Sequence, residues 1–288
     1  MDSLEHLRSW IGRSEQRTDT ITAAPLAGLA ATLDRDDPAP RDGTAVPPLW
    51  HWLYFLPMAR QSELGPDGHP RRGGFLPPVA LPRRMWAGGR LVFERALRVG
   101  ELATRSSRIA DVTGKEARSG PLVFVTVQHE ISTAAGLALR EDHDIVYRGA
   151  PAAGAASPPP AAAPRDETFA RTIVPDDVLL FRYSALTFNG HRIHYDRRYV
   201  TEVEGYPGLI VHGPLIATLL LDLLRRERPD AAVASFRFKA IRPTIDLHPM
   251  AVHGAPSADG GSVRLWATDH DGWLTMDASA TLRGKADR

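Results

Sequence analysis

Cysteine is absent from the sequence, and its absence excludes several kinds of site at once. Disulfides, thiolate nucleophiles and cysteine-bound zinc all need a sulfhydryl group. A chain without disulfides fits a reducing compartment, so we expect a cytoplasmic protein. The first ten residues, MDSLEHLRSW, do not combine a basic segment with an apolar run as a signal peptide does, and no apolar stretch is long enough for a transmembrane helix.

The chain also has almost no excess of charge of either sign. Its 288 residues include 35 Lys and Arg against 34 Asp and Glu, a formal net charge of +1 at pH 7. Such a balance gives no electrostatic reason to expect a nucleic acid or an anionic membrane as partner. Hydrophobic residues at 43% and charged residues at 24% are typical of a globular protein, and the length predicts two ordinary domains.

The glycine-rich fingerprints of several enzyme classes are missing as well. The sequence has no Walker loop, no G-x-G-x-x-G dinucleotide motif and no G-x-S-x-G nucleophile elbow. We therefore expect neither a nucleotide cofactor nor a serine hydrolase of that type.

What the first half does contain predicts short helices followed by an antiparallel meander. Apolar residues recur at helical spacing over residues 4–11 and 25–33, and the run PLWHWLYFLP at 48–57 is apolar enough to be buried as helix or strand. From Arg90 onward apolar residues alternate, again in PLVFVTVQHEI and once more over residues 137–147. Alternation with a period of two predicts strands.

Residues 65–89, GPDGHPRRGGFLPPVALPRRMWAGG, form a segment rich in glycine, proline and arginine. Long ordered loops in compact domains are usually lids or binding loops. The segment can therefore face an anionic ligand, or it can be a solvated loop. Its arginines are Arg71, Arg72, Arg83 and Arg84.

An Ala/Pro-rich spacer at residues 149–164 predicts the domain boundary. It separates a domain of residues 1–148 from one of residues 165–288. Beyond it the same order repeats, helical material first and then strand candidates at 232–242, 250–253, 262–268 and 273–282. We predict an α+β fold of two copies, each an antiparallel sheet wrapped around a helix, with a degenerate amino-terminal copy.

The most informative stretch is FRYSALTFNGHRIHYD at 181–196, followed by GLIVHGPLIATLLLDLL at 208–224. Leucines and isoleucine at helical spacing from residue 215 to 224 predict a helix buried on most sides. Pro214 suits the first turn of that helix, and Gly213 leaves its free amides open to an anion or an oxyanion. Alternatively, His212, Gly213 and Pro214 only start the helix tightly.

The runs YSALTFNGHRIHYD and GLIVHGPL resemble the MaoC-like dehydratases, the hot dog-fold family that contains the (R)-specific enoyl-CoA hydratases. That family carries a motif S-G-D-x-N-P-L-H, whose Asp and His activate water. Aligned on the last histidine, His194 matches the catalytic His and Ile193 the Leu, while Asn189 falls on the catalytic Asp. His191 and Arg192 replace the Asn and Pro of the motif. This form resembles the subgroup of double hot dog proteins that includes mesaconyl-CoA (3-methylfumaryl-CoA) hydratase and the mitochondrial-type 3-hydroxyacyl thioester dehydratases.

The resemblance implies a hydro-lyase that reversibly adds water to the double bond of a 2-enoyl-CoA thioester, with coenzyme A present only as part of the substrate. The subgroup suggests a short branched dicarboxylyl-CoA such as mesaconyl-CoA; itaconyl-CoA and longer enoyl-CoA chains are alternatives. His194 would move the proton, Asn189 would orient the water or the thioester, and the Gly213 amide would stabilise the oxyanion. The substrate-binding candidates are His191, Arg192, Asp196, His212, Arg83 and Arg84. Among the arginines, Arg192 is the first candidate to bind a free carboxylate of the substrate.

Three further expectations concern alternatives and assembly. Hot dog folds also serve as thioesterases and as noncatalytic acyl-CoA binding modules, so both functions remain alternatives.

The spacing His191-x-x-His194-x-Asp196 has metal-ligand types but no third defined ligand or helical H-E-x-x-H pattern, so no metal is predicted. If the two copies pair edge to edge, the monomer is the smallest folded unit, and a homodimer of it is possible.

Overall fold

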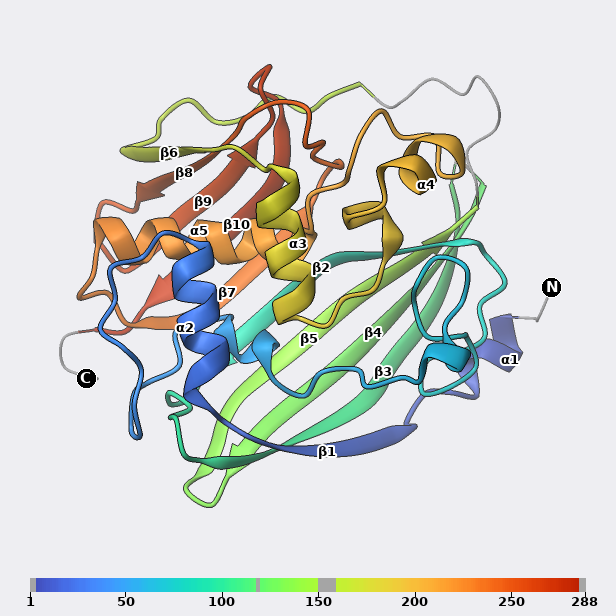
Figure 1. Ribbon diagram of the computed structural model, residues 1–288, viewed down its shortest axis with the longest axis horizontal. Coiled ribbons are helices and arrows are strands. Elements are labelled where there is room, and N and C mark those ends of the chain that lie inside the picture. The colour runs from blue at the N-terminus through green and yellow to red at the C-terminus, as the bar shows by residue number, and fades with distance from the viewer. Residues whose placement is uncertain (1–3, 118–119, 150–158, 285–288) are drawn as a thin grey trace.

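The computed structural model describes residues 4–117, 120–149 and 159–284, and one antiparallel sheet of ten strands runs through this part of the chain (Figure 1). The strands follow the order β1-β3-β4-β5-β2-β7-β10-β9-β8-β6. Their bounds are β1 (Ser14–Thr20), β2 (Arg83–Phe93), β3 (Leu102–Ala117), β4 (Gly120–Thr133), β5 (Gly136–Arg148), β6 (Phe169–Ile173), β7 (Val233–Ala240), β8 (Met250–Pro256), β9 (Ser262–Thr268) and β10 (Leu274–Leu282).

Helices cover one face of this sheet and connect its two halves (Figure 1). The α-helices are α1 (Leu4–Arg8), α2 (Ala23–Thr32), α3 (Asp177–Leu186), α4 (Arg197–Glu202) and α5 (Gly213–Glu227). Single turns of 3-10 helix lie at η1 (Trp50–Leu53), η2 (Gln61–Glu63) and η3 (Arg192–His194). Helix α3 packs against α2, so helical material from the two halves of the chain meets above the sheet.

Helix α5 is the buried helix that its leucine-rich sequence predicts. Leu215, Leu219 and Leu220 are no more than 2% exposed, and the helix packs against β6, β8, β9 and β10. Its basic residues gather in the last turn, where they favour the negative end of the helix dipole. Burial of the apolar side chains on nearly every side of α5 makes it the centre of the carboxy-terminal half.

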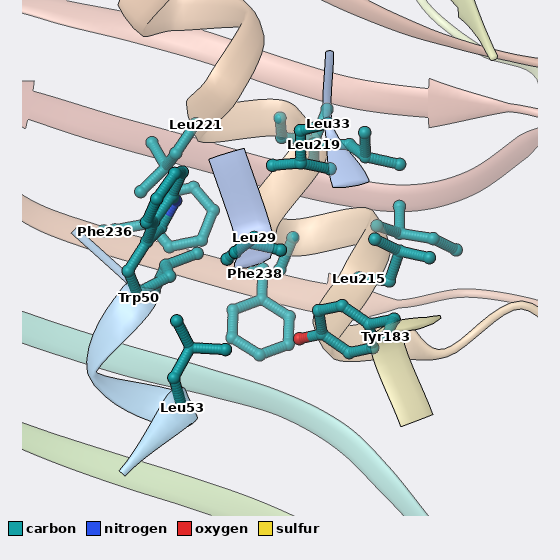
Figure 2. Packing of buried hydrophobic residues seen from close by; sticks show 14 of the residues in the cluster. Leu29, Leu33, Trp50, Leu53, Tyr183, Leu215, Leu219, Leu221, Phe236 and Phe238 are labelled. Carbon is teal, nitrogen blue, oxygen red and sulfur yellow. The ribbon is translucent and has the colours of Figure 1, made fainter. Parts of the chain in front are cut away.

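The same core also takes side chains from the amino-terminal half. In Figure 2, Leu29 of α2, Leu33 at its end, and Trp50 and Leu53 of η1 lie beside the leucines of α5 and the phenylalanines of β7. A smaller cluster joins Leu7 of α1 to apolar residues of β3 and β4 such as Val125 and Val127. Because the main core crosses the boundary between the halves, each half needs the other to bury its share of that core.

The two halves meet where β2 pairs antiparallel with β7. At this seam Gly88 and Gly89 lie against Phe238, and a Cβ on Gly88 would come within 2.5 Å of the Phe238 carbonyl oxygen. Only glycine permits this approach of two backbones. The predicted pair of sheets is thus one continuous sheet of two halves joined edge to edge.

Several element boundaries differ from the expectation. The Gly/Pro/Arg segment ends at Pro82 rather than at residue 89, because β2 already begins at Arg83 and pairs with β5. Strand β1 was not expected, since its residues SEQRTDT are polar and only alternate between partly buried and exposed. Strand β9 has the predicted bounds. Of the predicted spacer, residues 150–158 lie outside the described residues, and Ala162 forms an isolated β-bridge with Trp273.

Candidate active site

The turn after α3 presents the first of the predicted site residues. Phe188 takes a left-handed conformation (φ 49°), and the backbone N–H of Asn189 donates to the Ser184 carbonyl at 2.8 Å. The Asn189 Oδ1 then accepts the backbone N–H of His191 at 3.0 Å. Because the side-chain oxygen is engaged in this turn, the amide NH2 of Asn189 is the group left to donate to a ligand.

His194 lies in η3 with its imidazole inside the protein, 8% exposed. Its Nδ1 lies 2.7 Å from the Ile210 carbonyl oxygen, so in the neutral ring Nδ1 carries the hydrogen and Nε2 keeps its lone pair. Burial lowers the pKa of His194 to about 4, against the opposing effect of that hydrogen bond. The ring is therefore a neutral base at neutral pH.

The amino terminus of α5 lies beside this ring. His212, the residue before the helix, stacks on His194 with ring centroids 3.8 Å apart, and its Nε2 is 2.8 Å from the Ser184 hydroxyl. His212 is fully buried, which lowers its pKa well below the ordinary value. Its position makes it a support for the His194 ring. Its predicted contact with substrate stays a prediction.

Gly213 opens α5 with an amide that has no acceptor among the described residues. A Cβ added here would meet no atom within 4 Å, so the Cα of Gly213 borders open space. The free N–H groups and the dipole of a 15-residue helix favour negative charge at this point. A candidate base stacks on His212, and a candidate anion-binding amide follows His212 in the chain.

Part of the Gly/Pro/Arg segment, a loop of the amino-terminal half, packs against the turn that carries His191 and Arg192. The backbone N–H of Arg192 donates to the Asp67 carbonyl at 2.9 Å, and its Nη1 donates to the Pro66 carbonyl at 3.0 Å. Gly68 (φ 87°) touches Gly190 so closely that a Cβ would lie 1.9 Å from the Gly190 oxygen. This contact brings His69 to within 4.0 Å of His191 between ring centroids.

The arginines predicted to bind substrate differ in the contacts that their guanidinium groups already make within the protein. Arg192 pairs with Asp196 at 2.7 Å and lies over the Tyr199 ring, and Arg83 approaches Glu204 at 3.5 Å. In addition to pairing with Arg192, Asp196 caps α4 by accepting the N–H of Tyr199. The contacts of Arg192, Arg83 and Asp196 are those of structural residues, and they weaken the case for Arg192 as the carboxylate-binding arginine.

Arg84 is placed differently. It has no carboxylate partner within the described part of the chain, and its charge lowers the pKa of both His69 and His191. The pKa of His191 is lowered mainly by burial and then by the charges of His69 and His194. Arg84 is therefore a partly buried cation that is bonded to the Tyr147 hydroxyl, lies close enough to His69 and His191 to affect their pKa, and pairs with no carboxylate among the described residues.

The metal pattern considered in the sequence does not assemble, because Asp196 is held by Arg192 and α4. Asp67, His69 and His191 do bring ligand-type atoms within 4.8 Å of one another. However, the Asp67 carboxylate is already bonded to the His69 ring, and the Arg84 charge opposes a cation beside them. We therefore assign no metal to these residues. The sequence pattern missed Asp67 and His69, although the turn G-P-D-G-H marks them.

A cavity of about 390 Å³ lies elsewhere, lined by residues such as Trp50, Leu221 and Arg225 near the other end of α5. It does not include His194. No helix within the described residues has the length and apolar character needed to cross a membrane.

Comparison with known families decides the class of this protein. The family model described as hydroxyacyl-thioester dehydratase type 2 matches residues 49–246, a span that includes β2 to β5, the site histidines His69, His191 and His194, and the whole of α5. The chain belongs to this family. It is therefore an enoyl-thioester hydratase or dehydratase of the MaoC-like group, as the motif resemblance implied.

Relatives and solved structures agree with the family. The chain is 48% identical to mesaconyl-C(4)-CoA hydratase of Chloroflexus aurantiacus over 278 residues, 96% of this chain and 98% of that protein. A solved MaoC-like dehydratase aligns with a TM-score of 0.73 at 13% identity, over 98% of this chain and 99% of that one. A Mycobacterium tuberculosis protein described as a double hotdog aligns with a TM-score of 0.59 at 15% identity, over 95% and 96%. These structures show the hot dog-like α+β fold.

Proposed function

We propose that this hydratase adds water to a short branched dicarboxylyl-CoA such as mesaconyl-CoA, and catalyses the reverse dehydration. The near full-length relative at 48% identity bears the name of that activity. A free carboxylate at the end of the acyl chain would need a cation, because burying the charge unpaired is costly. Arg84, which lacks a carboxylate partner among the described residues, supplies that cation beside the histidines.

The observation that carries the chemistry is the stacking of the buried His194 ring, whose Nδ1 is bonded to the Ile210 carbonyl, on His212, the residue directly before the Gly213 amide, which has no acceptor among the described residues. In hydration, His194 takes a proton from the water that attacks the β-carbon. Negative charge then collects on the thioester oxygen, where the Gly213 N–H and the α5 dipole stabilise it. The NH2 group of Asn189 orients the water or the thioester. No cofactor takes part beyond the coenzyme A of the substrate.

The architecture extends this proposal to the domains. We infer a degenerate hot dog over residues 1–148, a spacer over 149–164 and the catalytic hot dog over 165–288. Strands β1 to β5 fall in the first unit and β6 to β10 in the second, which supports the division. The cytoplasmic location and a possible homodimer stay predictions.

One assay separates the candidate functions. The purified chain is incubated with mesaconyl-CoA, itaconyl-CoA and crotonyl-CoA while enoyl absorbance and free thiol are followed. Loss of absorbance without thiol release is the expected result, fastest with mesaconyl-CoA. Release of thiol would indicate a thioesterase, and no change with any substrate would favour a noncatalytic acyl-CoA binding module.

A further inference from the structure

Asp67 and His69 form a hydrogen-bonded pair on the loop that the amino-terminal half contributes to the site. The Asp67 Oδ2 lies 3.1 Å from the His69 Nδ1, and its Oδ1 accepts the His69 backbone N–H at 3.0 Å. One carboxylate therefore holds both the ring and the backbone of His69. With Nδ1 directed at Asp67, the ring leaves Nε2 free, and 22% of the His69 side chain stays exposed.

This pair is fixed against the carboxy-terminal half by backbone contacts. Gly68, between the two residues, rests on Gly190, and the Asp67 carbonyl accepts the N–H of Arg192. The His69 ring lies 4.0 Å from His191, which in turn lies 5.4 Å from His194. Three imidazoles thus form a row from the proposed base of one half to the Asp–His pair of the other.

The reaction needs two proton transfers, one from water and one to the α-carbon. An amide at Asn189 cannot hold a proton, and His212 is sealed in the core against Ser184. His191 has no carboxylate bonded to its ring in the described chain, whereas His69 has Asp67 to stabilise an imidazolium. We propose that His69, held by Asp67, is the second proton-transfer group of the hydration site; this inference rests on the proposed function.

In hydration, the water oxygen bonds to the β-carbon as one water proton passes to His194 Nε2. The electron pair of the double bond moves toward the thioester oxygen and returns to bind, at the α-carbon, the proton that His69 Nε2 releases. His69 is then neutral and His194 carries the extra proton, which returns to His69 through His191 or through solvent. The sum is one water added across the double bond, and dehydration runs the same steps in reverse.

The charges around His69 connect this role to the substrate. Burial lowers the pKa of His69, the Asp67 hydrogen bond raises it, and the charges of Arg84 and Arg72 lower it further. Proton uptake on His69 is therefore opposed by the guanidinium that we assign to the substrate carboxylate. An anionic acyl group beside Arg84 would offset that charge, so binding of the dicarboxylate would favour the imidazolium that the reaction needs.

Two variants test the pair, His69→Ala and Asp67→Asn, with His69→Gln as a variant that keeps most of the side-chain volume. The exposed pair His270 and Asp271, whose atoms lie 3.4 Å apart, offers the matched controls His270→Ala and Asp271→Asn. The expected result for His69→Ala is a fall in kcat of ~10²- to 10⁴-fold at nearly unchanged KM, with partial recovery in added imidazole. Asp67→Asn should shift the pH profile of kcat to lower pH, because the lost carboxylate no longer raises the pKa of His69. The controls should match the wild type.

Wild-type kcat in folded His69→Ala and His69→Gln would overturn the inference and leave the proposed function intact. Loss confined to KM, or loss of wild-type activity in EDTA with recovery on adding zinc, would also overturn it. If the wild-type chain hydrates none of the enoyl-CoA substrates, the proposed function falls and this inference falls with it. Circular dichroism and Tm of each variant confirm that the fold is retained.

Discussion

His194 is the residue on which the proposed chemistry depends most. Its buried neutral ring has one nitrogen bonded to a carbonyl and the other free, so its removal takes away the base without removing a charge. We expect His194→Ala to lower kcat by ~10²- to 10⁴-fold in a folded protein, measured with the preferred enoyl-CoA. His270→Ala, on the surface, is the control. Wild-type turnover in His194→Ala would show that the proton moves elsewhere.

Asn189→Asp addresses a different question at the same scale. If the site can use a carboxylate at this position, the variant should equal or exceed the wild-type kcat. If the NH2 group is needed as a donor, the variant should instead lose activity on mesaconyl-CoA and crotonyl-CoA alike, with a further loss on mesaconyl-CoA where the new anion repels its carboxylate. We expect the second result, because Oδ1 already accepts from His191 and only the NH2 group is free.

Arg84 and Arg192 separate substrate recognition from structural support. Arg84→Ala should weaken turnover of mesaconyl-CoA relative to crotonyl-CoA by ~2 to 5 kcal/mol, since the acyl carboxylate would lose its cation. Arg192→Ala should affect both substrates alike, because its contacts are with Asp196, Tyr199 and Pro66. The ratio of kcat/KM for the two substrates measures this. An unchanged ratio in Arg84→Ala would count against the dicarboxylate.

At the scale of elements, the contact between the 65–69 loop and the turn before η3 joins the two halves at the site. Gly68 and Gly12 both have φ near 88°, but only Gly68 has a neighbour that a Cβ would strike. Either substitution to alanine forces an L residue into the left-handed region, at a cost of ~1 kcal/mol.

Gly68→Ala should therefore lose activity as well as stability, because the loop that carries His69 must move away from Gly190. Gly12→Ala should lose stability alone. Comparing kcat/KM and Tm of the two variants distinguishes a displaced loop from general strain. Equal activity in the two proteins would mean that docking of the loop is not needed for turnover.

At the scale of the whole molecule, the seam between β2 and β7 decides how the chain can be divided. A fragment of residues 165–288 would expose the pairing edge of β7 together with the buried Phe236 and Phe238. Unpaired strand edges pair with other chains. We expect this fragment to self-associate or precipitate, as measured by light scattering, and a soluble, active, monomeric fragment would contradict the edge-to-edge arrangement.

Stability should also depend on pH through the buried histidines. Burial lowers the pKa of His129, His191 and His212, and that of His194 to about 4, from an ordinary value of 6.5. Below that ordinary value the unfolded chain binds more protons than the folded one, so the free energy of unfolding falls as pH falls. Each histidine contributes at most ~1.4 kcal/mol per pH unit. The Tm should drop between pH 6.5 and 4.5.

His129→Gln tests this whole-molecule effect away from the active site. His129 is 7% exposed and bonds to the Ser107 hydroxyl, which glutamine can also reach with a hydrogen bond. The variant should show a weaker dependence of Tm on pH, while His270→Gln keeps the wild-type slope. An equal slope in all three proteins would show that the buried histidines are not the groups that take up protons on unfolding.

Local spacing in the sequence determined much of this protein. Apolar residues three and four apart specified α5, and alternation specified β9 and the strands around it, because helix and strand each repeat with a fixed period along the backbone. The motif around Asn189 and His194 implied the reaction class through its resemblance to the MaoC-like dehydratases, which is visible because its residues are close in sequence. These features follow from neighbours along the chain.

Only the tertiary structure decided which distant residues complete the site. Asp67 and His69 lie more than a hundred residues before His194 in the sequence, and His69 reaches His191 beside it because Gly68 and Gly190 allow two backbones to touch. Arg84 and Arg192 look alike as sequence positions, yet one lacks a carboxylate among the described residues and the other is held by Asp196. The polar strand β1 and the single sheet likewise depend on edges that must pair. Which strand edge pairs with another, and which arginine finds a carboxylate, depends on residues far apart in sequence that folding brings together. Local spacing along the chain does not specify these partners.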